Sequence, residues 1–189
     1  MSVLRRMLVV ATLLAAVLGS AAAQAGDKLV FIVRHAEKAS ATDPDSPLSD
    51  AGRARAAALA NALRDANLTD VLVTSRMRTQ QTAAPAAALR SLTAHVVPLA
   101  GTVPEHVAAV AAAVRATKGN AVLVVGHSNT VPLIIAALGA PKVPDLCDPE
   151  YANLFIVRVP AAGAPTLVRA QYGAPDAPDA ASCAAASMK

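Results

Sequence analysis

The stretch VFIVRHAEKA, residues 30–39, joins an apolar run to a cluster of ionisable side chains. Residues 28–33 have the length and the apolar character of a buried β-strand. The next five residues, RHAEK, include an arginine, a histidine, a glutamate and a lysine. Because such groups are costly to bury without partners, their position at the end of the most apolar strand indicates a functional site there.

A second stretch, AVLVVGHSNT at residues 121–130, has the same design. Its apolar part predicts another strand, over residues 120–125. The polar sequence GHSNT follows this strand and leads into a predicted helix over residues 130–138. The two stretches therefore place one histidine each at the end of a buried strand.

A third apolar segment, residues 70–73, ends at Thr74 and is followed by SRMRTQQTA, which contains Arg76 and Arg78. Ligands of open α/β sheets bind at the carboxyl ends of the strands. We therefore expect the two histidines and up to three arginines of these segments to meet at one edge. Guanidinium groups match phosphate oxygens in bidentate fashion, so the pattern predicts a site for a dianionic phosphoryl group.

A zinc site is the alternative reading of the same residues. His35, His127 and Glu37 are all ligand types that zinc accepts. Arg34 argues against this alternative, because a guanidinium group beside His35 would repel a cation. We therefore expect neither a bound metal nor a cofactor.

The chain between residues 26 and 173 alternates strand-like and helix-like segments and is expected to be one domain. Strands are predicted over residues 28–33, 70–73, 94–98, 120–125, 154–159 and 166–170, and helices over 49–66, 78–90, 104–117 and 130–138. Ser49 is the expected N-cap of the first helix, and Pro85 is expected to kink or divide the second. The alternation predicts an α/β fold, a three-layer α/β/α sandwich around a mostly parallel sheet.

The N-terminus has the features of a secretory signal peptide over residues 1–25. Arg5 and Arg6 precede an apolar segment over residues 7–18, and small residues follow it. A membrane anchor is the alternative, but about twelve apolar residues are too few to span a bilayer core. We therefore expect a periplasmic or secreted protein with no membrane attachment after cleavage.

The composition of the chain narrows its possible partners. Loss of Arg5 and Arg6 with the signal peptide lowers the formal net charge from +4 to +2, and only 2% of the residues are aromatic. Neither the net charge nor the aromatic content is typical of a protein that binds nucleic acid.

Residues 174–189 form an Ala/Pro-rich tail. In an oxidising compartment Cys147 and Cys183 are expected to form a disulfide, with two unpaired thiols as the alternative.

Four motifs in a fixed order resemble those of the histidine phosphatase superfamily, also called phosphoglycerate mutase-like. They are RHAEK after the first strand, LSDAGRARA soon after it, TSRMRTQQTAAP next and VVGHSNTVP late in the chain. The resemblance extends over residues 28–172, and the order of the four motifs makes it specific.

The resemblance implies a role for each matching residue. His35 would be the nucleophile that becomes phosphorylated, and Arg34 would bind phosphate oxygens. The family's second arginine stands four residues before the threonine of QTA, which selects Arg78 over Arg76. His127 would be the second histidine of the phosphate pocket.

A general acid must protonate the leaving oxygen, and two carboxylates are candidates. Glu105 lies in GTVPEHVAA, a connecting segment in which the family often places its acid, but it also fits a capping box that begins at Thr102. Glu37 is the rival, because it follows the nucleophile closely. His95 and His106 are predicted to be surface residues without a role.

The expected pocket is open. Ser128 and Asn129 are expected at its rim, and Glu37 and Lys38 near the leaving group. The chain has no room for the cap domain that larger members carry. These features predict a metal-independent phosphomonoesterase that acts on a phosphorylated small molecule or a phosphoprotein through a phosphohistidine intermediate. The alternatives are a phosphomutase and a non-catalytic module that binds phosphate or a phospholipid headgroup.

Overall fold

The structure, a computed structural model, describes residues 26–176. The predicted signal peptide and residues 177–189 of the predicted tail lie outside this range. The elements are β1 (Lys28–Arg34), α2 (Asp50–Ala62), β2 (Asp70–Val73), α3 (Met77–Ala88), β3 (His95–Val96), α4 (Val103–Ala116), β4 (Ala121–Gly126), α5 (Val131–Ala137), β5 (Asn153–Val159) and β6 (Thr166–Gln171). Within residues 26–176, no helix combines the length and the apolar composition needed to cross a membrane.

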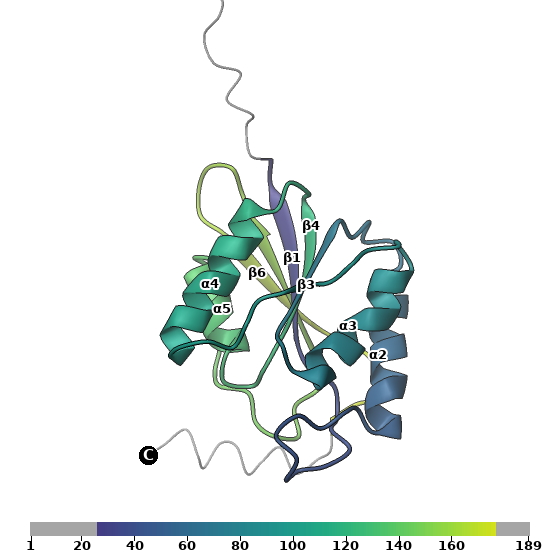
Figure 1. Cartoon of the computed structure of the whole chain (residues 1–189). Coiled ribbons are helices and arrows are strands. Elements are labelled where there is room, and N and C mark those ends of the chain that lie inside the picture. The colour runs from purple at the N-terminus through teal and green to yellow at the C-terminus, as the bar shows by residue number, and fades with distance from the viewer. Residues whose placement is uncertain (1–25, 177–189) are drawn as a thin grey trace, which may run out of the picture.

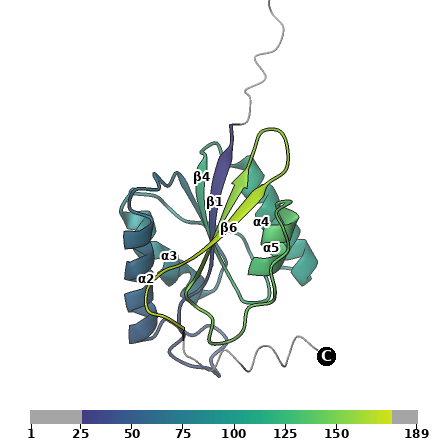
Figure 2. The same cartoon turned by 180° about the vertical axis from the view of Figure 1, so that it is seen from behind.

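The strands of the described residues form one mixed sheet in the order β3-β2-β4-β1-β5-β6. β1 pairs with β4, β4 with β2 and β2 with β3, all in parallel. β5 runs antiparallel to β1, and β6 runs antiparallel to β5. Helices α2 and α3 cover one face of the sheet, and α4 and α5 cover the other (Figures 1 and 2). The predicted α/β/α sandwich around a mostly parallel sheet is confirmed.

The side chains of β1 alternate between the two halves of the core. Val30 and Ile32 pack with the apolar faces of α4 and α5, and Phe31 and Val33 pack with those of α2 and α3. None of the four side chains is more than 7% exposed. A strand that is covered on both faces has to be apolar throughout, which explains the unbroken run that precedes the polar cluster.

Local sequence signals set the starts of two helices. The Ser49 hydroxyl accepts a hydrogen bond from the Gly52 amide, as expected of an N-cap. α4 begins with a capping box between Thr102 and Glu105. α3 continues through Pro85 as one helix, so this proline does not divide it. Buried alanines on both sides of the proline pack against the sheet, which offsets the lost hydrogen bond.

The register of the parallel strands aligns the ends that carry the polar clusters. Arg34 at the end of β1 lies opposite Gly126 at the end of β4. The His35 amide then donates to the Gly126 carbonyl at 2.9 Å. Val73, the last residue of β2, lies opposite Val125. The residues that follow all three strands therefore start from the same edge of the sheet.

Candidate active site

His35 follows β1 directly and is only 4% exposed. Its Nδ1 lies 2.8 Å from the carbonyl oxygen of Ala36. A carbonyl can only accept, so Nδ1 carries the proton and Nε2 keeps a free lone pair. Burial is the main cause that lowers the pKa of the imidazole to about 3, and the charges of Arg34, Arg78 and Lys38 contribute. The ring is therefore neutral at ordinary pH, through burial more than through the arginines.

His127, the residue after β4, lies beside His35 with 5.4 Å between the two ring centroids. Its Nδ1 lies 3.5 Å from a terminal nitrogen of Arg78, which can only donate. Nδ1 is therefore the acceptor, and Nε2–H donates to the Thr74 hydroxyl oxygen at 3.1 Å. Burial is the main reason why the pKa of His127 is also lowered to about 3. The structure thus brings the two histidines together, both neutral.

Arg78, at the second position of α3, is the arginine that reaches His127. Its Nη1 donates to the Pro44 carbonyl at 2.9 Å, so the loop after β1 holds the guanidinium group in place. Its Nε is buried and has no hydrogen-bond partner among the described residues. Arg76 lines the adjoining cavity together with Arg78.

Arg34 is buried and turned toward the loop that precedes β5. Its Nη1 donates to the carbonyls of Cys147 at 2.7 Å and Asp148 at 2.8 Å, and its Nη2 donates to the Asp148 carboxylate at 3.1 Å. Its Nε is also buried without a partner among the described residues. Sequence reasoning expected Arg34 to bind phosphate and missed this loop, which carries no recognisable motif.

Tyr151 is another residue that sequence reasoning missed. Its ring centroid lies 6.3 Å from that of His35, and the Arg34 guanidinium carbon lies 4.2 Å from the same ring. Burial raises the pKa of the phenol, so the ring stays neutral beside the nucleophile. A single tyrosine ahead of a strand offers no pattern from which this position could be predicted.

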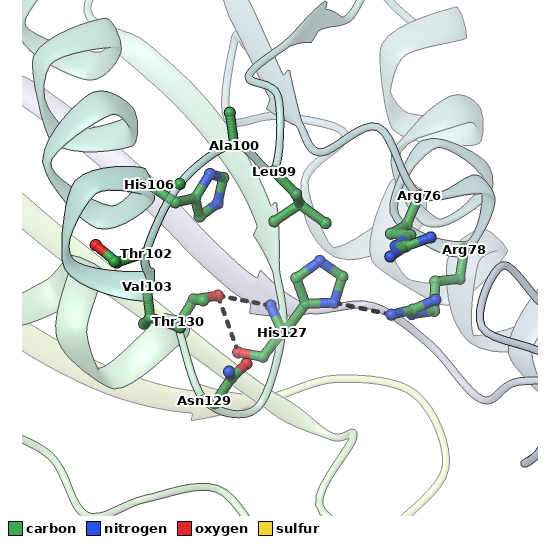
Figure 3. Close-up of a pocket in the computed structure, with 11 residues that line it drawn as sticks. Arg76, Arg78, Leu99, Ala100, Thr102, Val103, His106, His127, Asn129 and Thr130 are labelled. Carbon is green, nitrogen blue, oxygen red and sulfur yellow. Dashed lines mark hydrogen bonds between the residues drawn. The ribbon is translucent and has the colours of Figure 1, made fainter.

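A cavity of about 300 Å³ opens beside His127. Figure 3 shows Arg76 and Arg78 on one side of His127 and His106 with the start of α4 on the other. The wall of the cavity consists of the two arginines, residues 99–103, His106, His127, Asn129 and Thr130. Among these described residues there is no carboxylate, and His35 is not one of them. The cavity therefore adjoins the histidine pair on the His127 side and favours an anionic or neutral group over a cation.

Glu105, the first candidate acid, is held by its own helix. Its Oε2 accepts hydrogen bonds from the Thr102 amide at 2.7 Å and the Thr102 hydroxyl at 2.9 Å. These bonds lower the pKa of the carboxyl group, whereas a general acid needs a raised one. The capping-box reading of Glu105 is confirmed, and Glu105 does not belong to the described wall of the cavity.

Glu37, the rival acid, is paired with an arginine that sequence reasoning did not single out. Its Oε1 accepts a hydrogen bond from Nε of Arg55 at 2.9 Å and lies 2.7 Å from Nη2 of the same arginine. The Arg55 side chain is 5% exposed and also donates to the Tyr172 carbonyl at 3.2 Å. Glu37 thus ties the segment after the nucleophile to α2 and to the residues that follow β6.

His106 is not a surface residue, so that prediction is wrong. It is 3% exposed and shares the buried face of α4 with Val107 and Val110. The helical spacing that predicts this face also includes position 106, so the burial could have been predicted. His95 is exposed, as predicted.

The predicted rim residues differ in position. Asn129 lines the cavity, whereas Ser128 is half-buried and lies outside its described wall. Thr130, which was not predicted, accepts a hydrogen bond from the His127 amide at 3.0 Å and so fixes the turn after β4. Lys38 lies near enough for its charge to lower the pKa of the nucleophile.

Within residues 26–176, no group of three or more His, Cys, Asp or Glu side chains is arranged to hold a metal ion. The imidazoles of His35 and His127 have guanidinium groups as neighbours, which suits an anion better than a cation. Cys183 lies outside the described residues, so the disulfide between it and Cys147 stays a prediction.

Known proteins share both sequence and fold with this chain. A family model described as "Histidine phosphatase superfamily (branch 1)" matches residues 30–99. The putative phosphohistidine phosphatase SixA from Nakamurella multipartitia is 26% identical and has a TM-score of 0.54 over 79% of this chain and 98% of its own. The protein histidine phosphatase SixA complexed with tungstate is 24% identical, with a TM-score of 0.60 over 76% of this chain and 96% of its own. No curated protein sequence matches the chain.

A more distant likeness supports the fold alone. A mycobacterial glucosyl-3-phosphoglycerate phosphatase is 14% identical, with a TM-score of 0.57 over 79% of this chain and 100% of its own. The region matched by the family model contains His35 and Arg78, and the structural matches extend over most of the described residues. The family model, the order of the motifs and the paired histidines thus agree in their likeness to branch 1 of the histidine phosphatase superfamily.

Proposed function

We propose that the protein is a metal-independent phosphomonoesterase in which Nε2 of His35 attacks phosphorus. The proposal rests on the burial and the protonation state of His35. The ring is buried and neutral, and the Ala36 carbonyl fixes the proton on Nδ1, which leaves the lone pair on Nε2. Imidazole attacks phosphorus only through such a neutral nitrogen.

The phosphoryl group would lie between His35 and His127. Arg34 and Arg78 each have a buried Nε–H without a partner among the described residues, and phosphoryl oxygens would supply the missing acceptors. A dianion at this place also raises the pKa of His127, so Nδ1 can take up a proton and donate to a phosphoryl oxygen. These donors would stabilise the negative charge that spreads over the equatorial oxygens in the transition state.

The proposed reaction has two steps. In the first step, the bond from Nε2 of His35 to phosphorus forms as the bond to the leaving oxygen breaks, and the leaving oxygen takes the electron pair and a proton. In the second step, water attacks phosphorus, the P–N bond breaks, and its electron pair returns to the imidazole. The products are the free alcohol and inorganic phosphate.

The proposed substrate is a phosphoryl group displayed on a protein or another bulky partner. Leu99 and Val103, in the wall of the cavity, are 38% and 40% exposed, which suits contact with a partner surface. Two of the similar structures bear the name of phosphohistidine or protein histidine phosphatases. The signal-like residues 1–25 support the further proposal that the protein is exported, and N-terminal sequencing of periplasmic protein would test it.

Hydrolysis of an aryl phosphate in excess chelator tests the proposed reaction. The wild-type protein should release inorganic phosphate at a rate that the chelator does not change, and His35→Ala should lose at least about 10³-fold in kcat. The exposed His95→Ala variant is the matched control and should retain full activity.

Three outcomes would each support a different function. Activity that disappears with chelator would favour a metal site. Stabilisation by phosphate without turnover would favour a binding module. Transfer of the phosphoryl group to a second substrate without phosphate release would favour a phosphomutase.

A further inference from the structure

The proposed first step needs a proton donor, and neither candidate carboxylate is placed to act as one. Glu105 is hydrogen-bonded to Thr102, and Glu37 is paired with Arg55 at 2.7 Å. Besides the two arginines, the described wall of the cavity contains two side chains that can carry a transferable proton, the imidazoles of His106 and His127.

His127 is already engaged on both ring nitrogens. Its Nε2 donates to Thr74 and its Nδ1 faces Arg78. Because Nδ1 is the nitrogen proposed to contact the phosphoryl oxygens, His127 has no ring nitrogen left to protonate the leaving group. His106 is therefore the group that remains.

His106 is held in a defined orientation with one nitrogen unused. Nδ1 lies 3.0 Å from the Pro98 carbonyl, so Nδ1 carries a proton in every charge state. Nε2 is buried and has no hydrogen-bond partner among the described residues. An unpartnered buried nitrogen costs free energy, so its retention calls for an explanation.

The cavity beside His127 is the larger of the two described spaces that the His106 side chain lines. His106 lines it from the α4 side, opposite Arg76 and Arg78 (Figure 3). A second void of about 10 Å³ also touches His106, but its other lining residues are mostly apolar, and a water molecule needs two to four polar partners. If the phosphoryl group lies between His35 and His127, the group attached to it extends into the larger cavity.

We propose that His106 is the catalytic acid of the reaction, an assignment that rests on the proposed function. As the bond from phosphorus to the leaving atom breaks, that atom takes the electron pair and a proton from Nε2–H of His106. In the second step the neutral Nε2 takes a proton from the attacking water, which restores the imidazolium. The other charged or titratable groups in the described wall of the cavity are Arg76, Arg78 and His127, and an anionic phosphoryl group would offset the charge of the two arginines.

The dependence of the rate on the leaving group tests this assignment. His106→Asn keeps a side-chain N–H for Pro98 and removes Nε2. We expect kcat for an alkyl phosphate such as glycerol phosphate to fall by about 10²-fold or more, since an alkoxide leaves poorly without a proton. For p-nitrophenyl phosphate, whose leaving anion is stable, the loss should stay below about tenfold.

The exposed residue His95 provides the matched control, because His95→Asn makes the same chemical change on β3 and should alter neither rate. Equal losses on both substrates, or no loss on either, would overturn the assignment and leave His106 a packing role. A selective loss in Glu105→Gln instead would transfer the role to Glu105. His106→Gln, whose amide cannot release a proton, repeats the comparison if the asparagine variant does not fold.

The variant His35→Ala separates this inference from the proposed function. Turnover that survives in His35→Ala defeats the proposed function itself. Loss of turnover there, combined with equal losses on both substrates in His106→Asn, defeats only the assignment of the acid.

Discussion

Arg34, the residue before the nucleophile, donates to the Asp148 carboxylate at 3.1 Å, although the Asp148 side chain is 99% exposed. A phosphoryl group at His35 has to compete with this carboxylate for the guanidinium group. Asp148→Asn should therefore lower KM for an aryl phosphate by up to about fivefold, the scale of an exposed ion pair, with little change in kcat. Asp145→Asn removes the same charge from the same loop and is the control for long-range electrostatics. An unchanged or raised KM would show that Asp148 orients Arg34 and does not compete with the substrate.

At the scale of elements, α2 approaches the segment after the nucleophile so closely that only glycine fits at position 52. A Cβ on Gly52 would lie 2.3 Å from the Glu37 carbonyl oxygen. Gly52→Ala should therefore lower the free energy of unfolding by about 1–3 kcal/mol, although alanine favours a helix by about 1 kcal/mol. Denaturant titration measures the change, with Gly26→Ala as control because a Cβ there meets nothing within 4 Å. A stabilised Gly52→Ala protein would contradict the close approach.

At the scale of the whole molecule, two buried neutral histidines link stability to pH. The pKa values of His35 and His127 fall from 6.5 to about 3 on folding. Below pH 6.5 the unfolded chain binds protons that the folded protein does not bind, so the free energy of unfolding should fall as the pH is lowered toward 3. Denaturant unfolding at a series of pH values measures this dependence. The free energy of unfolding should change less steeply with pH in the double variant His35→Asn/His127→Asn than in the wild-type protein. Equal slopes would mean that the folded protein already holds both rings protonated.

The fold could be predicted because its signals are local. The apolar run of β1 and the polar residues after it identify a strand that is covered on both faces, and Ser49 and Thr102 mark two helix starts through their own hydrogen bonds. The convergence of His35 and His127 follows from strand order and register. The same local reasoning recognised the capping box of Glu105.

The parts of the site that could not be predicted depend on contacts between distant residues. Arg34 and Cys147 are 113 positions apart, and no local pattern shows that the loop before β5 would hold the arginine. The ion pair between Glu37 and Arg55 likewise depends on how α2 packs against β1. The burial of His106 is different, because the spacing of the apolar residues in α4 already places it on the inner face.

The central claim is that the phosphoryl group passes through His35, and trapping the intermediate tests it most directly. The reaction with an aryl phosphate is quenched in alkali, where phosphohistidine survives, and the protein is digested with trypsin, which releases the peptide HAEK, residues 35–38. We predict that this peptide carries the mass of one phosphoryl group during turnover and that the label is absent in His35→Ala. Turnover without the label, or a phosphoryl group on another residue, would contradict the account.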